Sequence, residues 1–465
     1  MKSTPYMDLP VSSLRAEYLI GGTTSLPRTL RRLLLFVGVF SSFLPYLAIG
    51  FGHSSAIQLS QVTLISAGLL GLPLLRRRLS FAVYLLICPL ILSLFVLNLN
   101  VSPGLSSLVG FKSSVDTAFS VASLMGAAAI VDIEDLILIL RALTAAFLAN
   151  AVYGVFQFIE FHRGVFPLLW MYRLNPSFLI FTTTSAQTYL QNSPRPFGFF
   201  SEPSAMAACI GPWLCMMLVV YFLVTRHGRV LPKFFKFLIF TSVISSALLL
   251  AVSQSGMAPF ALGGLFLCIL FFSVFREKSP VDELARAPYH PHKSVQSLSR
   301  KLILVLGVIG AIGIGELSSR YGANGGTINS SWSQRWESIV IGLHLLPTSI
   351  SHLLFGVGPG QSSILIQSVA PEIIRFYGII PIIAIWSVTI NYIVEVGVIG
   401  AFSLIILIVL AFKRILNGSS LRFVGVVILG LWLVAASATT SYVTLTPIWM
   451  LFGVLLSWDA VTAIR

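Results

Sequence analysis

Apolar residues along this chain come in blocks of about twenty, separated by short polar stretches. A membrane-crossing helix needs about 20 mainly apolar residues, because the hydrocarbon core of a bilayer is about 30 Å thick. The pattern therefore predicts an all-α, polytopic integral membrane protein with one domain over residues 1–465. Twelve segments are expected to span the membrane: 33–52, 56–75, 79–98, 114–131, 136–159, 203–224, 237–254, 257–275, 302–317, 383–411, 423–440 and 443–458.

The composition agrees with this class. Apolar residues make up 56% of the chain and charged residues 10%, whereas soluble domains have about 45–50% and 25%; the mean hydropathy is +0.91. The net charge of +14 does not require a nucleic-acid partner, because basic residues in a polytopic protein gather in cytoplasmic loops. The four cysteines have no metal-ligand spacing, and we expect them to be core or lipid-facing residues.

The distribution of basic residues predicts the orientation of the chain. If the N-terminus is cytoplasmic, 22 of the 30 Lys and Arg residues fall on the cytoplasmic side. The inverted topology would place these residues outside, against the positive-inside rule. Both termini are therefore predicted to be cytoplasmic.

Two predicted outer connections are long, 160–202 and 318–382, and the cytoplasmic connection 276–301 is polar and basic. Within the second outer connection, apolar residues recur at Ile339, Leu343 and Leu346. This spacing is typical of an amphipathic helix lying at the outer interface.

Arginines on the predicted outer side are the first candidates for a binding or catalytic role. A guanidinium is a planar fork that can bind phosphate in two places and that stays charged in a partly dry site. Four of these arginines lie in the two long outer connections, and we expect them to bind an anionic ligand. Lipid headgroups or helix ends are the alternative partners. The four arginines are Arg195, Arg320, Arg335 and Arg375.

Two carboxylates accompany these arginines. Glu202 lies at the start of a predicted span, just before Pro203, and Ser201 is the expected N-cap. The Glu202 carboxylate either stabilises the helix end or lines a cavity, where it could accept a proton from a hydroxyl. Glu395 lies deeper, where Gly397 and Gly400 are expected to leave room for close helix approach. A glutamate there must be paired, protonated or in contact with water. Aromatic residues near the outer connections form an interfacial belt or stack on sugars, among them Trp336.

Several functions are disfavoured because their motifs are absent. The sequence contains no G-x-x-x-x-G-K-[ST] phosphate loop, no H-E-x-x-H zinc motif, no G-x-S-x-G and no D-x-D metal pair. A nucleotide-driven pump or a zinc protease is not expected, and neither a cofactor nor a metal ion is predicted.

Four segments together resemble one family. They are RPFGFFSEPSA (195–205), SQSG (253–256), SQRWESIVIGLHLLPTSISHLLFGVGPG (333–360) and NYIVEVGVIG (391–400). In order and spacing they are similar to the bacterial O-antigen polymerases and O-antigen ligases. The R-x-x-W, G-V-G-P-G and E-x-G-x-x-G elements, in that order, are the most specific part.

This resemblance implies an inverting, GT-C-like membrane glycosyltransferase whose donor is a polyprenyl-pyrophosphate-linked glycan at the periplasmic face of the bacterial inner membrane. Its partners would be a flippase, a chain-length regulator and membrane lipids. Arg195 and Arg335 match the family's arginine positions, and Glu202 is the first choice for the base. The remaining expected substrate contacts are Arg320, Arg375, Glu395, Tyr392 and Trp336.

The polymerase is favoured over the ligase. Ligases carry a His-Asn pair about nine residues before the glutamate of E-x-G-x-x-G, where this chain has Trp386. A ligase that joins glycan to lipid A core stays open as an alternative. An anionic-solute transporter is a second alternative, although the internal repeat typical of many transporters is not evident in the sequence.

Overall fold

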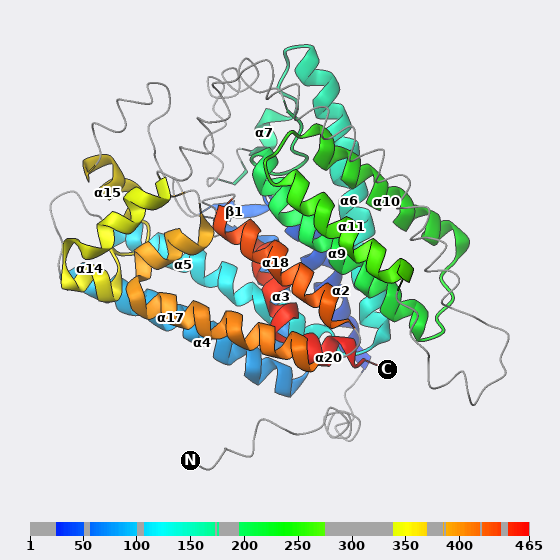
Figure 1. Cartoon of the computed structure of the whole chain (residues 1–465), viewed down its shortest axis with the longest axis horizontal. Coiled ribbons are helices and arrows are strands. Elements are labelled where there is room, and N and C mark those ends of the chain that lie inside the picture. The colour runs from blue at the N-terminus through cyan, green and yellow to red at the C-terminus, as the bar shows by residue number, and fades with distance from the viewer. Residues whose placement is uncertain are drawn as a thin grey trace.

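The computed structural model describes residues 25–50, 56–99, 107–172, 174–175, 195–274, 338–369, 385, 387–418, 421–438 and 445–464. Within these residues the protein is mostly helical (Figure 1). All but one of the twelve predicted segments fall at least partly on helices, and segment 302–317 lies outside the described residues. In the part of the chain that the structure describes, five helices are long and apolar enough to cross a membrane: α4, α6, α9, α10 and α17.

The bounds of the helices are as follows: α2 Ser25–Ser42, α3 Leu59–Leu69, α4 Pro73–Leu99, α5 Ser107–Ala122, α6 Ile133–His162, α7 Leu169–Tyr172, α9 Pro203–Arg226, α10 Lys233–Val252, α11 Ala258–Val274, α14 Ile350–Phe355, α15 Ser362–Val369, α17 Val388–Asn417, α18 Arg422–Ala438, α19 Thr446–Leu456 and α20 Trp458–Thr462. Residues 338–345 are also helical, and two short 3₁₀ helices are described, η1 Ser123–Ala129 and η3 Leu346–Thr348.

The first predicted span differs from the structure at both ends. Helix α2 begins eight residues earlier than the predicted 33–52 segment and ends at Ser42. It stops shortly before Pro45, as expected because a proline disfavours helical backbone in the preceding residue. The chain then forms an antiparallel pair of strands, β1 (Ala48–Gly50) and β2 (Ala56–Gln58), which the sequence did not predict.

The predicted 114–131 span is divided between two kinds of helix. Helix α5 ends at Ala122 and continues directly into the 3₁₀ helix η1, whose residues are all buried. Neighbouring backbones come very close to this segment: a Cβ added to Gly68 would lie 2.2 Å from the Met125 carbonyl oxygen, and one added to Gly453 would lie 2.2 Å from the Leu124 oxygen. Glycine is required at both positions because any side chain would displace η1.

Helix α9 runs through the centre of the bundle. It contacts α6, α10, α11, α18 and α19, and its whole apolar stretch is buried (Figure 1). A helix that is apolar on all sides fits such a position, because no face of it meets water. Three of the four cysteines also belong to the core, whereas Cys88 is exposed on α4, and both placements agree with the sequence prediction.

The structure forms a helix in the middle of the second long connection, but its buried face differs from the one that the sequence predicted. Residues 338–345 are helical and continue into η3. Ile341 and Leu345 are buried there, and Leu343, which was expected on the apolar face, is exposed. The helix packs through Ile341 and Leu345 on a small cluster that includes Val357 and Val394.

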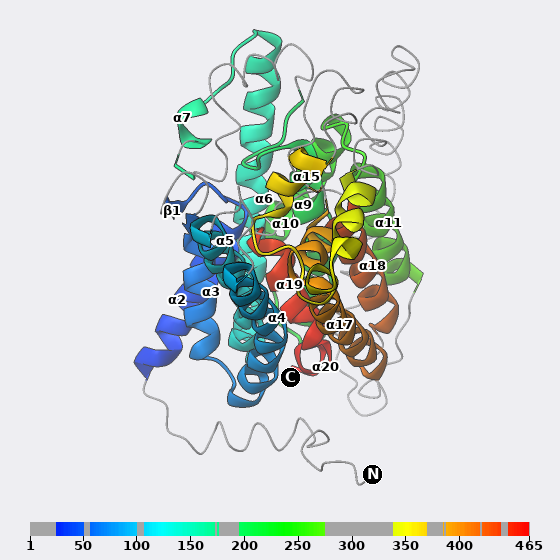
Figure 2. The same ribbon diagram turned by 90° about the vertical axis from the view of Figure 1, so that its left-hand side faces the viewer.

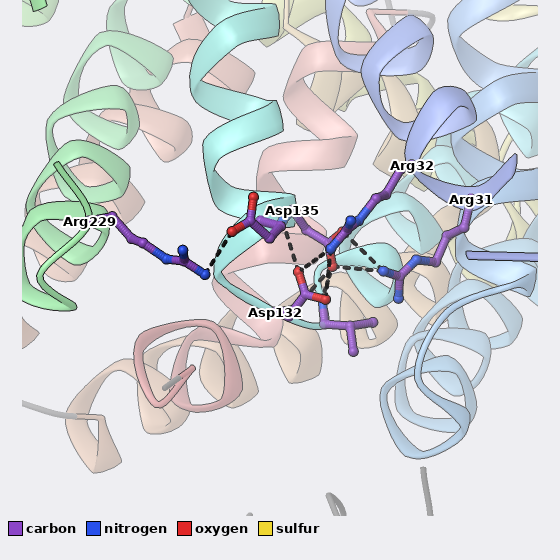
Figure 3. Close-up of polar contacts among 7 residues, drawn as sticks. Arg31, Arg32, Asp132, Asp135 and Arg229 are labelled. Carbon is purple, nitrogen blue, oxygen red and sulfur yellow. Dashed lines mark hydrogen bonds and ion pairs between the residues drawn. The ribbon is translucent and has the colours of Figure 1, made fainter. Parts of the chain in front are cut away.

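One end of the bundle is held by buried and half-buried ion pairs. Arg31 lies 3.0 Å from Asp135, and these side chains are only 1% and 0% exposed. Arg32 bridges Asp132 and Asp135 at 3.0 and 3.1 Å (Figure 3). Asp132 and Asp135 also form the capping box that starts α6. Burial opposes ionisation of Asp132, but the Asp135 amide and the Arg32 guanidinium outweigh it and hold the pKa of Asp132 below its usual range.

Further ion pairs lie at the same end. Arg78, near the start of α4, and Arg414, near the end of α17, both contact Asp459 of α20. Arg229, just after α9, lies 2.8 Å from Glu134 (Figure 3). In Figure 2 the start of α2 and α20 occupy this lower end, whereas α7 and α15 lie at the opposite, upper end. The arginines of these ion pairs, which the positive-inside rule assigned to the cytoplasm, therefore gather at one end of the described molecule.

Candidate functional site

The stretch before α9 is held by two buried amide side chains of α6. Gln157 accepts a hydrogen bond from the Phe197 amide and donates one to the Gly198 carbonyl, each 3.0 Å long. Asn150 accepts one from the Phe199 amide, also 3.0 Å long. Gly198 has a φ of +56°, and a Cβ there would lie 2.5 Å from the Asn150 Oδ1 atom. The PFGFF backbone is therefore fixed to the wall of α6.

Arg195 joins this stretch to the turn between α10 and α11. Its guanidinium Nη1 donates to the Gln254 carbonyl oxygen at 3.1 Å, and its side chain is half-buried. Gln254 belongs to the SQSG turn and has a φ of +50°, a left-handed conformation that is uncommon for a residue with a side chain. Two of the four resembling segments, 195–205 and 253–256, are thus in direct contact.

Glu202, not Ser201, is the N-cap residue of α9, and this corrects the sequence expectation. Pro203 occupies the first helical position, which suits its fixed φ and missing N–H. The Glu202 carboxylate makes no capping bond to the helix backbone. Instead it accepts a hydrogen bond from the Ser204 hydroxyl at 2.6 Å, while the buried Ser201 hydroxyl has no partner. The half-buried carboxylate is therefore not occupied by ordinary helix capping.

The other two resembling segments meet at a break in helix α17. Gly397 has φ +71° and ψ −166°, so the helix is interrupted there. The carbonyl of Val394 accepts from the Val357 amide at 2.9 Å, and the carbonyl of Glu395 accepts from the Gly358 amide at 3.2 Å. We refer to this junction, residues 354–358 with residues 394–397, as the clasp.

The Glu395 side chain is held at the clasp by hydrogen bonds. It is buried, and the Ser362 hydroxyl lies 2.8 Å from its Oε1 atom and 2.8 Å from the Asn391 Oδ1 atom. The Gly360 backbone and the Asn391 side chain also hydrogen-bond to the carboxyl group. Because neutral donors surround Glu395, its polar atoms are satisfied without an ion pair among the residues that the structure places.

Tyr392 and Ser93 connect the clasp to helix α4. The Tyr392 hydroxyl, predicted to contact glycan, is buried and donates to the Leu86 carbonyl at 2.6 Å. The Ser93 hydroxyl donates to the Glu395 carbonyl at 2.6 Å. As expected from the sequence, Gly397 permits close approach, since a Cβ there would lie 2.5 Å from the Leu354 carbonyl and the Gly356 nitrogen. Gly400 instead faces Val396 and Tyr392 of its own helix.

Both junctions lie away from the ion-pair end. Asn150 and Gln157 are in the C-terminal half of α6, whose N-terminus carries the Asp132 and Asp135 ion pairs. Ser93 is likewise in the C-terminal half of α4, far along the helix from Arg78. Figure 2 shows α15, which follows the 354–358 part of the clasp in the chain, in the upper half of the molecule. The structure thus brings the four segments together in two pairs toward one end.

Not every predicted residue can be located. Arg320, Arg335, Trp336 and Arg375 lie outside the described residues. In contrast, the structure adds contacts that the sequence analysis missed, namely those of Asn150, Gln157 and Ser93. The signal for the first two was present: two amides seven residues apart in an apolar span occupy one helix face and must find buried partners.

The stretch that leads into α9 carries a guanidinium, a carboxylate free of capping bonds and a buried hydroxyl without a partner among the described residues. Such a set can bind an anionic group and accept a proton. Among the described ranges, no three His, Cys, Asp or Glu side chains gather as metal ligands would. No protein-family model matches this chain, and no curated protein matches it.

Proposed function

We propose that this protein is a membrane glycosyltransferase that polymerises a surface polysaccharide. It transfers a glycan from a polyprenyl-pyrophosphate carrier to a lipid-linked repeat unit at the outer face of the bacterial inner membrane. The observation that carries the proposal is the pairing of the four resembling segments: 195–205 contacts 253–256, and the 354–358 backbone contacts 394–397. Segments that share a site in a family are expected to meet in the fold.

The distribution of charge supports an outer position for this site. Ion pairs and basic residues mark the opposite end of the bundle, which the positive-inside rule assigns to the cytoplasm. Lipid-linked repeat units are delivered to the outer leaflet, where no nucleotide sugar is required. The absence of nucleotide-binding motifs from the sequence agrees with such a donor.

The chemistry assigns a separate task to each charge. The acceptor hydroxyl attacks the anomeric carbon, the bond from that carbon to the pyrophosphate oxygen breaks, and the pyrophosphate leaves with the electron pair. Arg195 stabilises the charge that grows on the leaving group, an interaction that strengthens in the transition state. Glu202 accepts the hydroxyl proton. Arg335 is proposed as a second pyrophosphate ligand, and Arg320 and Arg375 as further ones, on sequence alone.

The broken helix α17 is the one observation that favours a transporter. Transporters use broken helices near the bilayer midplane, where freed carbonyls coordinate ions. Here the carbonyls of Val394 and Glu395 already accept hydrogen bonds from Val357, Gly358 and Ser93. These carbonyls are already occupied by protein donors, so the break in α17 forms the backbone hydrogen bonds of the clasp. The polymerase is therefore the better proposal.

Deleting the gene in its host and separating the surface glycan on a gel tests the proposal. A polymerase predicts that the ladder of long chains disappears and that one repeat unit stays attached to the lipid A core. Loss of all attached glycan would instead identify the ligase. An unchanged ladder would exclude both activities.

Neutralising either charge at the start of α9 is expected to abolish chain growth. We expect Arg195→Ala and Glu202→Gln each to lower polymerisation by at least about 100-fold, the usual effect of losing a transition-state ligand or a general base. The assay is complementation of the deletion strain, with membrane insertion checked by blotting. Arg163→Ala and Glu160→Gln are the matched controls, because these residues form an ion pair at the C-terminal end of α6 and have no assigned task. Wild-type ladders from both test variants would remove Arg195 and Glu202 from the mechanism.

A further inference from the structure

A shallow groove lies on the outside of the bundle, where α3 ends and α4 begins. Its volume is about 480 Å³, and it is open on one side. The lining combines two arginines with two aromatic side chains, one serine and one leucine. The lining residues are Leu69, Arg76, Arg77, Ser80, Phe81 and Tyr84.

The two arginines of the groove differ from the third member of their triplet. Arg78 turns to the interior and contacts Asp459 at 3.5 Å. Arg76 donates to the Leu69 carbonyl at 2.9 Å, and neither Arg76 nor Arg77 forms an ion pair with any carboxylate that the structure describes. Most other arginines at this end are neutralised by aspartate or glutamate, so the groove carries two uncompensated positive charges.

An apolar stripe continues from the groove along α4. Exposed side chains follow one helix face from Arg77 through Phe81 and Tyr84 to Ile91 and Phe95. This stripe extends over about 27 Å at 1.5 Å per residue, comparable to the thickness of the hydrocarbon core. Only 33% of the apolar stretch of α4 is buried, the smallest share among the five long apolar helices. The stripe therefore faces lipid along its length.

We propose that this groove binds the headgroup of an anionic glycerophospholipid of the cytoplasmic leaflet. The phosphate lies between Arg76 and Arg77, the headgroup hydroxyls reach Ser80 and Tyr84, and one acyl chain follows the stripe that begins at Phe81. The lining contains no carboxylate, so the cationic amine of a zwitterionic headgroup would find no anionic partner there. Two guanidiniums next to an apolar track match a lipid with net negative charge.

Lipid binding to the purified full chain in detergent micelles tests the proposal. Dioleoylphosphatidylglycerol and dioleoylphosphatidylcholine are titrated separately, and native mass spectrometry gives the apparent Kd of the first bound lipid. We expect phosphatidylglycerol to bind more tightly than phosphatidylcholine. The double variant Arg76→Gln with Arg77→Gln should weaken phosphatidylglycerol binding about thirtyfold, because each basic residue near an anionic surface contributes about fivefold.

A second double variant, Arg28→Gln with Arg422→Gln, is the control for net charge. It removes two exposed arginines that are predicted to be cytoplasmic but do not line the groove, and it should keep wild-type affinity. The single variant Arg77→Gln keeps the Arg76 bond to Leu69 and so separates binding from local folding. Equal affinity for the two lipids, an equal loss in both double variants, or displacement of the lipid by inorganic phosphate at the same concentration would overturn the proposal.

Discussion

Replacing Asp135 by leucine is expected to destabilise the folded state of this protein strongly. Asp135 accepts hydrogen bonds from Arg31 at 3.0 Å and from Arg32 at 3.1 Å, and its Oδ2 atom also accepts from the Val131 and Asp132 amides. Without this carboxylate, Arg31 would keep its full charge in a site where it is 1% exposed. Its Nε and Nη1 atoms already have no hydrogen-bond partner, so Asp135 is its main compensation.

The expected loss is large because an uncompensated buried charge remains. Removing one partner of a buried ion pair costs about 3–5 kcal/mol, a large share of the roughly 5–15 kcal/mol that stabilises a typical fold. Fluorescence-detected gel filtration and the midpoint of thermal unfolding in micelles measure the effect. Glu134→Gln is the matched control on the adjacent residue, since its pair with Arg229 is 43–53% exposed and should contribute at most about 1 kcal/mol after screening by solvent.

A second substitution separates charge from packing. Combining Arg31→Met with Asp135→Leu removes both charges and should recover much of the unfolding temperature, because apolar replacement of a buried ion pair is often close to neutral. Recovery is expected to be incomplete, since Arg32 and the two amides still lose their acceptor. A single Asp135→Leu variant that unfolds at the wild-type temperature would refute this account of Arg31.

The sequence predicted the helical spans because their signal is local. A block of apolar residues must avoid water whatever its neighbours are, and α4, α6, α9, α10 and α17 were all anticipated in this way. The gathering of basic residues at one end was likewise predictable, since it depends only on which connections carry arginine. Ion-pair partners were not predictable: Arg31 and Asp135 are 104 positions apart, and only the packing of α2 against α6 brings them together.

The candidate site shows the same division between local and tertiary information. The motifs around Glu202 and Glu395 were visible in the sequence because unusual residues stand beside apolar runs. Their partners depend on backbone geometry that no local pattern encodes, such as the +71° φ at Gly397 and the resulting bonds to residues 357 and 358. The capping residue of α9 was misplaced by one position, because Ser201 is the better N-cap by propensity, whereas Pro203 determines where the helix starts.

Replacing Gly397 or Gly356 by alanine is expected to open the clasp. At Gly356, which has a φ of +79°, a Cβ would lie 2.3 Å from the Glu395 carbonyl; at Gly397 it would lie 2.5 Å from the Leu354 carbonyl. Both close neighbours are backbone atoms, so no side chain can rotate away. A left-handed φ costs a residue with a Cβ roughly 1–2 kcal/mol, and each buried hydrogen bond left unmade at Val394 and Glu395 costs about 1–3 kcal/mol more.

Hydrogen–deuterium exchange measures this effect independently of any assumed activity. In both variants the amides of Val357 and Gly358 should exchange much faster, because they lose their acceptors across the clasp. If the clasp also holds the proposed site, chain growth should fail even though the helices that bear the ion pairs stay intact. Gly430→Ala in α18 is the matched control: it has open space around it and lies within a helix, so it should stabilise the fold by about 0.5–1 kcal/mol. Exchange at the wild-type rate for the Val357 and Gly358 amides in Gly397→Ala would contradict this account. It would mean that the broken helix accommodates a side chain and that α17 does not need the left-handed glycines to contact the 354–358 turn.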